Sequence, residues 1–149
     1  MPAKREEILG EIKERLGSKI VDVFEKNPRR IFVEVKPEDI REVTKVMFAD
    51  MGARFQIASG VDAPAAIEIL YNWAFDTLDC LVIVKVKLDK NNPVIDSCAS
   101  VCVATEWIER EMWELLGITF KGHPDMRHLL LLDDWPEGKY PLRRDYTPE

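Results

Sequence analysis

Prolines at positions 124, 136, 141 and 148 cut the C-terminal part of the chain into pieces too short for a helix. Each proline also removes a backbone hydrogen-bond donor. The segment nevertheless carries a leucine run, Trp135, Tyr140 and paired charges, whereas solvated tails are poor in such apolar residues. A segment of this kind cannot form a core of its own. We therefore expect residues 118–149 to be an extended, proline-rich arm that lies on its own domain or on a partner protein.

A short amphipathic helix is predicted immediately before the arm, over residues 106–116. Thr105 is placed to cap its N-terminus, and Gly117 is placed to end it in a left-handed conformation. At about 100° per residue, the helix presents one apolar stripe. The stripe consists of Ile108, Met112, Leu115 and Leu116.

The carboxylates of this helix need partners. Helical spacing places Glu109 and Glu111 at the borders of the apolar stripe, and it turns Glu106, Arg110 and Glu114 towards solvent. An unpaired carboxylate beside an apolar face costs several kcal/mol. We expect Glu109 and Glu111 to have cationic partners rather than raised pKa values, and no nucleophile accompanies them for acid–base catalysis. The arm supplies the candidate partners, which are His123, Arg127, His128, Arg143 and Arg144.

The residues upstream of the arm predict a platform domain over residues 1–117. The expected elements are helices at 3–16 and 37–52 and strands at 20–24, 31–35, 54–61, 67–75, 80–88 and 94–100. Alternation of apolar and polar residues is clearest over residues 67–75. Short connections between consecutive strands favour antiparallel neighbours. We therefore predict a single α+β domain with helices packed on one face of a mixed, mostly antiparallel sheet.

The composition argues against several functional classes. The net charge is −6, and lysines and arginines are spread among acidic residues, so no basic stripe is available for nucleic acid. No apolar run approaches the roughly 18 residues that a membrane span needs, and the charged N-terminus lacks the apolar region of a signal peptide. Three cysteines without an export signal indicate reduced thiols in the cytoplasm.

The reactive side chains form no complete catalytic, cofactor or metal site. Cys98 and Cys102 lie where an alternating strand needs small apolar residues, and a closed zinc or iron–sulfur site needs about four ligands, so we interpret both as core residues. His123 and His128 offer a metal site together with neighbouring aspartates. They lack a supporting cysteine and a helical i,i+4 spacing, which favours a structural or interface role.

Three blocks of sequence resemble a known family. They are Glu109–Phe120 (EREMWELLGITF), Gly122–Arg127 (GHPDMR) and Pro141–Tyr146 (PLRRDY). In this order they resemble the C subunit, a small hydrophilic subunit, of NADH–quinone oxidoreductase, which is respiratory complex I. They also resemble the matching small subunit of energy-converting membrane-bound nickel–iron hydrogenases. Glu114 stands where aspartate is common, Leu116 stands where an aromatic residue is common, and the chain stops soon after the third block. These departures favour the hydrogenase-like branch.

The resemblance implies a role in a larger assembly. It predicts a non-catalytic peripheral subunit of an ion-pumping respiratory redox complex, on the cytoplasmic side of the cell membrane. The subunit would bind no cofactor itself. It would dock on the large subunit, which houses the quinone pocket or nickel–iron centre, beside the iron–sulfur subunit.

Two alternatives remain open. The first is a subunit of a true NADH–quinone complex or of a related quinone- or sulfur-reducing complex. The second is a small free-standing metal-binding enzyme that uses His123 and His128. The candidate interface or structural residues are Glu109, Arg110, Glu111, Trp113, Gly117, His123, Pro124, Arg127, Trp135, Pro141, Arg143, Arg144 and Asp145.

Overall fold

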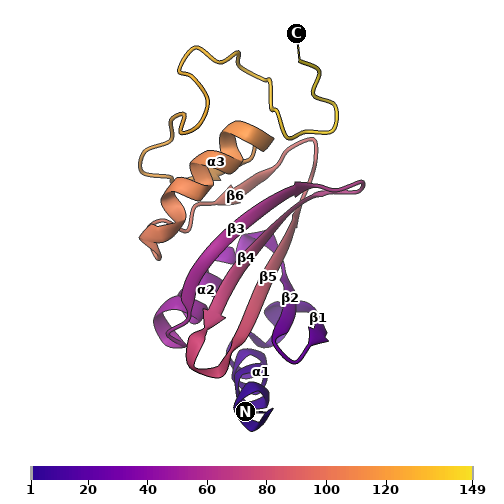
Figure 1. The fold of residues 1–149 in the computed structure, drawn as a ribbon, viewed down its shortest axis with the longest axis vertical. Coiled ribbons are helices and arrows are strands. Elements are labelled where there is room, and N and C mark those ends of the chain that lie inside the picture. The colour runs from indigo at the N-terminus through magenta and orange to yellow at the C-terminus, as the bar shows by residue number, and fades with distance from the viewer. Residues whose placement is uncertain (1, 149) are drawn as a thin grey trace.

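A twisted five-stranded sheet forms the centre of the molecule (Figure 1). The computed structural model describes residues 2–148, and the side chains of residues 6–148. The strand order is β1-β2-β5-β4-β3, and the β2–β5 pair is parallel while the other neighbours are antiparallel. The predicted mixed, mostly antiparallel sheet is therefore confirmed. The strands are β1 (Ile20–Asn27), β2 (Arg30–Val35), β3 (Arg54–Asp62), β4 (Ile67–Phe75) and β5 (Cys80–Leu88).

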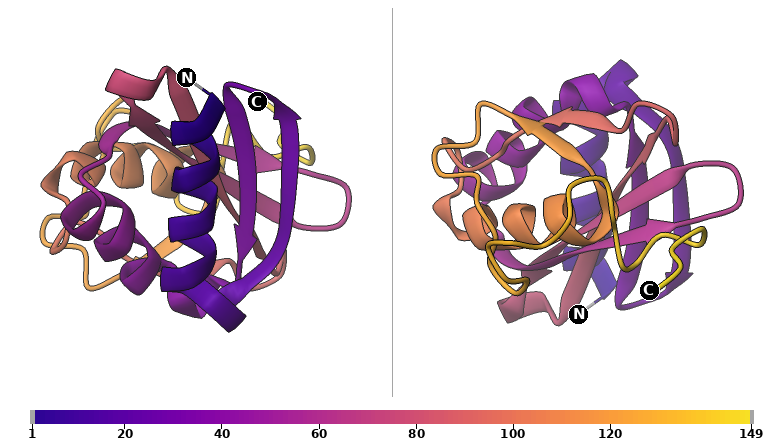
Figure 2. Two further views of the ribbon diagram at one scale, coloured as in Figure 1. Left: turned by 90° about the horizontal axis from the view of Figure 1, so that it is seen from below. Right: turned by 90° about the horizontal axis from the view of Figure 1, so that it is seen from above.

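Helices cover one face of this sheet (Figure 2). They are α1 (Pro2–Leu16), α2 (Ile40–Lys45), which is followed by a π-helical turn over Val46–Asp50, and α3 (Glu106–Leu116). Gly17 and Gly52, which follow the first two helical segments, have φ values of +52° and +69°, so each supplies the left-handed residue that stops a helix. The predicted packing of helices on one face is confirmed. None of the helices in residues 2–148 has the length and apolar character needed to span a bilayer.

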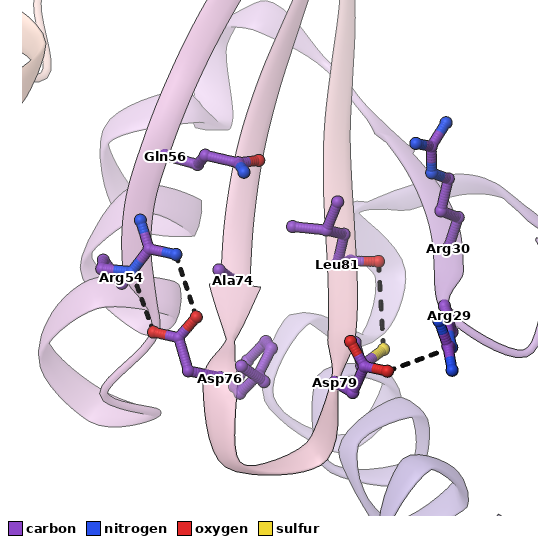
Figure 3. A pocket seen from close by; sticks show the side chains of 10 residues that line it. Arg29, Arg30, Arg54, Gln56, Ala74, Asp76, Asp79 and Leu81 are labelled. Carbon is purple, nitrogen blue, oxygen red and sulfur yellow. Dashed lines mark hydrogen bonds and ion pairs between the residues drawn. The ribbon is translucent and has the colours of Figure 1, made fainter.

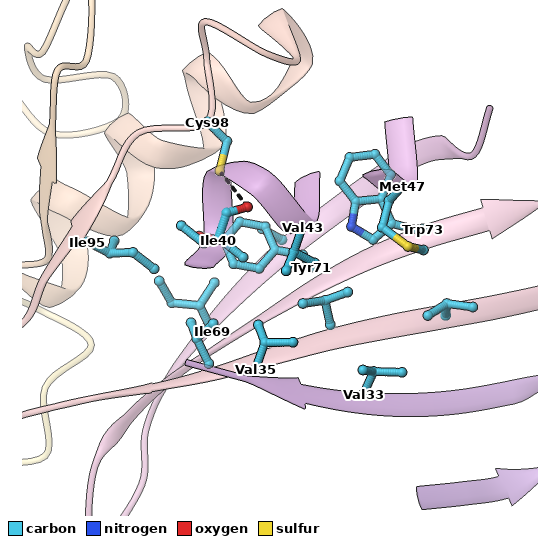
Figure 4. Close-up of a cluster of buried hydrophobic side chains, with 14 of the residues drawn as sticks. Val33, Val35, Ile40, Val43, Met47, Ile69, Tyr71, Trp73, Ile95 and Cys98 are labelled. Atoms are coloured by element: carbon cyan, nitrogen blue, oxygen red, sulfur yellow. Dashed lines mark hydrogen bonds between the residues drawn. The ribbon is translucent and has the colours of Figure 1, made fainter. Parts of the chain in front are cut away.

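The core lies between the helices and the inner face of the sheet (Figure 4). The alternation predicted for β4 is confirmed, because Ile67, Ile69, Tyr71 and Trp73 are all completely buried. Figure 4 shows Trp73 beside Met47, which lies in the π-helical turn. Burial of an aliphatic side chain such as Ile67 or Ile69 contributes about 1.5–3 kcal/mol. A slip of one residue would expose this whole row, so the core determines the register of the sheet.

The predicted strand at 94–100 is wrong in length and in its partner. The observed β6 spans only Val94–Asp96, and it pairs in parallel with β7 (Thr119–Lys121) in a separate two-stranded sheet. The strand ends there because the Ser97 hydroxyl and the Cys98 amide bind a helix carboxylate instead of a neighbouring strand. Cys98 and Cys102 therefore lie in turns, although both are buried in the core as predicted. Burial raises the pKa of the Cys98 thiol to about 12, so this thiol is unreactive at neutral pH.

Candidate functional site

Helix α3 is the element around which the candidate site is arranged. Met112 and Leu116 are buried against the sheet, where the absence of a side chain at Gly60 makes room for Leu116. Thr105 stands at the N-cap position but does not cap the helix, because its hydroxyl donates to the Cys102 carbonyl at 3.0 Å. Gly117 ends the helix with φ +75°, as predicted.

Glu114 faces the arm and is buried, so its predicted outward orientation is wrong. Its carboxylate accepts hydrogen bonds from the backbone amides of Leu129, Leu130 and Leu131 at 3.0, 2.7 and 3.3 Å. The Nδ1 atom of His128 also lies 3.0 Å from it. Burial alone would raise the pKa of Glu114, but these donors outweigh it and the pKa is lowered. Glu114 therefore holds residues 128–131 as an ionised acceptor.

Arg110 holds the same stretch by its carbonyl groups, and it too is buried rather than exposed as predicted. Its Nε donates to the Arg127 carbonyl at 3.0 Å, and its Nη2 donates to the His128 carbonyl at 2.7 Å. The rings of Trp113 and His128 lie 5.1 Å apart, which adds a packing contact. Together Arg110 and Glu114 satisfy both the donors and the acceptors of one loop.

The loop fixed in this way presents leucines to the solvent. Leu129 and Leu131 are half-buried, whereas Leu130 is 64% exposed and Leu132 is 74% exposed. Residues 129–132 do not form a strand, because the amides of Leu129, Leu130 and Leu131 bind a carboxylate and not a second strand. We call residues 128–132 the leucine loop.

The end of the arm returns to the C-terminus of α3 (Figure 1). The Arg143 guanidinium donates to the Leu116 carbonyl, and the Leu142 amide donates to the Leu115 carbonyl at 2.9 Å. These donors satisfy carbonyls that the end of a helix leaves without partners. The Arg144 amide and Nε donate to Asp62, at 2.9 and 2.8 Å. Contacts with the platform thus fix both ends of the arm.

The hydrogen-bond partners of Glu109 differ from the predicted ones, which were cationic side chains of the arm. It is completely buried, and it accepts hydrogen bonds from the Ser97 hydroxyl at 2.6 Å and from the Cys98 amide at 2.9 Å. The arm residue that lies beside it is His123, whose Nε2 is 3.9 Å away and donates to the Glu106 carbonyl. No arginine pairs with it in the described part of the chain. Burial raises the pKa of Glu109, so the expectation of an unraised pKa is also wrong.

The Glu109→Gln variant is expected to gain stability relative to the wild type as the pH rises. The folded-state pKa of Glu109 lies above its ordinary value of 4.5, so its contribution to stability is complete below that value. The contribution is lost as the pH rises through the folded-state pKa, whereas a neutral amide does not titrate. Urea unfolding of both proteins well below and well above pH 4.5 measures the difference.

Glu111→Gln is the control on the same helix, because Glu111 is half-buried at the surface. We expect that variant to stay close to the wild type at both pH values. A difference between Glu109→Gln and the wild type that does not change with pH would contradict the burial argument.

The remaining candidate residues lie on the outside of the arm. Arg127 pairs with Asp125 at 2.9 Å and is exposed, so its predicted pairing with a helix glutamate is wrong. The Trp135 indole donates to the Lys139 carbonyl at 2.7 Å and closes a short loop. Pro124, Pro141 and Asp145 are exposed or half-buried, and Glu111 lines a groove beside α3.

A family model described as "respiratory-chain NADH dehydrogenase, 30 Kd subunit" matches residues 33–149 of the chain. The chain belongs to this family. The match spans the sheet from β2 onwards, α3 and the whole arm, so the 30 Kd subunit family shares the elements that build the candidate site.

Two relatives are similar to this chain over most of its length. The NADH-quinone oxidoreductase C subunit of Chloroherpeton thalassium is 38% identical over 141 residues, which are 91% of this chain and 58% of the relative. This chain thus spans little more than half the length of that relative. The F(420)H(2) dehydrogenase C subunit of Methanosarcina mazei is 35% identical, over 80% of this chain and 77% of the relative.

A solved structure shows the same fold. A chain in the structure of the membrane-bound sulfane sulfur reductase, an archaeal respiratory membrane complex, superposes on this 30 Kd subunit family member with a TM-score of 0.84. It is 26% identical, and the superposition covers 97% of this chain and 86% of that one. The platform and the arm therefore occur together in that complex.

The two histidines of this 30 Kd subunit family member do not share a site. His123 bonds to the Glu106 carbonyl, and His128 bonds to Glu114. Among the described residues, no three histidine, cysteine or acidic side chains are grouped so as to hold a metal ion. The two residues of the metalloenzyme alternative, His123 and His128, are thus bound to different partners on α3.

A polar cleft lies beside the turn between β4 and β5 (Figure 3). The sequence analysis did not predict it. It has a volume of about 290 Å³ and contains three arginines. Arg54 forms two hydrogen bonds with Asp76, at 2.8 and 2.9 Å, and Arg29 pairs with Asp79 at 3.0 Å. Only Arg30 has no ionic partner among the described residues. Asp76 and Asp79 thus neutralise two of the three arginines in the cleft.

Proposed function

We propose that this chain is a non-catalytic, peripheral subunit of a membrane-bound respiratory oxidoreductase complex of the complex I type. In this role it docks on the large subunit of that complex and stabilises it. The names of the relatives support the class of complex, since they are subunits of quinone-reducing, F420H2-oxidising and sulfur-reducing respiratory systems. The observation that carries the docking role is the leucine loop.

The leucine loop has the properties of a preformed binding surface. Its backbone is held by Glu114 and Arg110, so little conformational freedom remains to be lost on binding. Its two exposed leucines, Leu130 and Leu132, are apolar anchors that water solvates poorly. A rigid loop that exposes large apolar groups gains free energy when a partner covers them.

The arm, residues 118–149, is in our proposal the docking part, and residues 1–117 are its platform. Within the candidate set, the buried Arg110 holds the arm through two backbone carbonyls, the buried Glu109 holds the turn after β6, and the half-buried Gly117 lies against Tyr140 of the arm. In our proposal these residues position the arm rather than contact the partner. The exposed members, such as Arg127 and Asp145, lie where they can contribute polar contacts at the rim of the interface.

The proposed partners are the large subunit and the iron–sulfur subunit of the same complex. By resemblance to the small hydrophilic subunit of complex I, the redox chemistry belongs to these partners, in iron–sulfur clusters and in a quinone pocket or nickel–iron centre. The same resemblance favours the cytoplasmic side of the cell membrane and a complex that couples electron transfer to ion translocation.

Replacing both exposed leucines with serine should weaken binding to the large subunit about tenfold without changing the stability of the isolated chain. The Leu130→Ser/Leu132→Ser double variant removes apolar contact area, but it leaves the bonds to Glu114 in place because these use the backbone. Binding is measured by titrating the tagged chain against the purified large subunit, and stability is measured by urea unfolding.

Val21→Ser provides the control, since Val21 is 52% exposed on β1, away from the arm. It should leave binding unchanged. Wild-type affinity in the double-leucine variant would refute the proposed role of the leucine loop.

A further inference from the structure

Strand β3 is an edge strand whose central residues carry no charge, and a β-bulge interrupts its pairing between Phe55 and Ile57. It has one neighbour, β4, in the five-stranded sheet. Between Arg54 and Asp62 it reads Phe-Gln-Ile-Ala-Ser-Gly-Val, without a charge or a proline. No backbone hydrogen bond in the described part of the chain reaches residues 55–61 from outside the β3–β4 ladder. Natural edge strands usually carry lysine, proline or a cover that prevents pairing with another chain.

A groove runs beside this edge, between β3 and α3. It has a volume of about 240 Å³ and is mainly apolar. Its walls include Ile57 and Gly60 from β3, Ile108 and Leu115 from α3, and Leu142 from the arm. Ile57 is 46% exposed and Leu142 is 57% exposed, so these two walls of the groove are accessible to solvent.

The groove carries a negative charge and no positive one. Glu111 is the charged residue in its wall, and no ionic partner of this carboxylate exists among the described residues. The basic residue at the start of β3, Arg54, is already neutralised by Asp76. A ligand that fills the groove therefore meets apolar walls and one uncompensated negative charge.

We propose that this groove receives an extended segment of a partner subunit, which adds as a sixth strand to the free edge of β3. The segment carries apolar side chains at alternate positions and a lysine or arginine that reaches Glu111. This inference rests on the proposed function, because it adds a second contact to the docking by the leucine loop.

The chemistry of the groove favours an extended strand over a helix. One wall is an unpaired strand edge whose amides and carbonyls need partners, and a helix has already used its own backbone groups. In an added strand, alternate side chains would enter the groove while the others point away.

Hydrogen–deuterium exchange on the isolated chain and on the complex purified through a tag on this chain tests the proposal. We expect exchange of the amides in residues 55–61 to slow about tenfold in the complex. The Ile57→Lys variant, which places a charge at the free edge, should lower the yield of assembled complex about tenfold. Val21→Lys on β1, at the opposite edge of the sheet, is the matched control and should assemble normally.

The outcomes separate this inference from the proposed function. If residues 55–61 exchange equally fast in both samples while assembly still depends on the leucine loop, the groove proposal is overturned and the docking role stands. If assembly depends on neither, both fail. Protection in the isolated chain that grows with its concentration would indicate pairing of two copies through β3, and it would also overturn the proposal. The exchange measurement needs no variant, so a folding defect in Ile57→Lys does not affect it.

Discussion

Glu114→Ala is expected to destabilise the isolated chain by about 3 kcal/mol and to release the leucine loop. The substitution leaves three backbone amides and the His128 ring without their acceptor. Each donor left unsatisfied costs about 1–3 kcal/mol when it stays buried, but water can reach the half-exposed loop and recovers part of the loss. Urea unfolding measures the free-energy change, and amide exchange at Leu129–Leu131 measures the release.

Glu111→Ala is the matched control, because Glu111 lies on the same helix and has no partner to lose among the described residues. We expect it to stay within about 0.5 kcal/mol of the wild type. If Glu114→Ala were as stable as this control, the carboxylate would not be the group that holds the loop.

Periodicity predicted those parts of the fold in which each element has one buried side. The row Ile67, Ile69, Tyr71 and Trp73 alternates because β4 has a core face and a solvent face, and the structure confirms it. Gly117 was predicted from a rule that depends only on local backbone geometry, and it too is confirmed. Both predictions depend on neighbours close in the chain.

The orientation of Glu114 and Arg110 was mispredicted for a physical reason. A helical wheel assumes that one side of a helix is buried, but α3 is enclosed by the sheet, by the turn after β6 and by the arm. A polar residue can be buried on the arm side because the arm brings backbone donors and acceptors from 15–18 residues away. The run of leucines after His128 was the available signal, since leucines at the surface of an irregular segment need an element that holds them.

The turn after β6 shows the same limit. Residues 94–100 fit the pattern of a strand, yet Ser97 and Cys98 leave the strand to bind Glu109. These two hydrogen bonds join Glu109 to residues 12 and 11 positions earlier in the chain. Neither the helical nor the strand period of a sequence predicts such a contact. The contacts that create the candidate site are thus the ones that sequence periodicity cannot detect.

Helix α3 joins the two proposed contact surfaces. Arg110 and Glu114 on one side fix the leucine loop, and Glu111 and Leu115 on another side line the groove beside β3. Because α3 packs on the sheet through Met112 and Leu116, both surfaces have a fixed position relative to the core. A partner that engages both would therefore bind a rigid unit, and the two contacts would reinforce each other through high effective concentration.

Gly117→Ala is expected to destabilise the chain by about 2 kcal/mol. Gly117 has φ +75°, which an L-residue adopts only with strain, and an added Cβ would lie 2.6 Å from the ring of Tyr140. Gly122→Ala separates the two causes, because Gly122 has φ +79° but open space around it. It should cost only the backbone strain, about 1 kcal/mol. Urea unfolding of both variants measures the difference, which isolates the contact between the arm and the end of α3. Equal losses would mean that Tyr140 moves away freely and that this part of the arm is not packed on the helix.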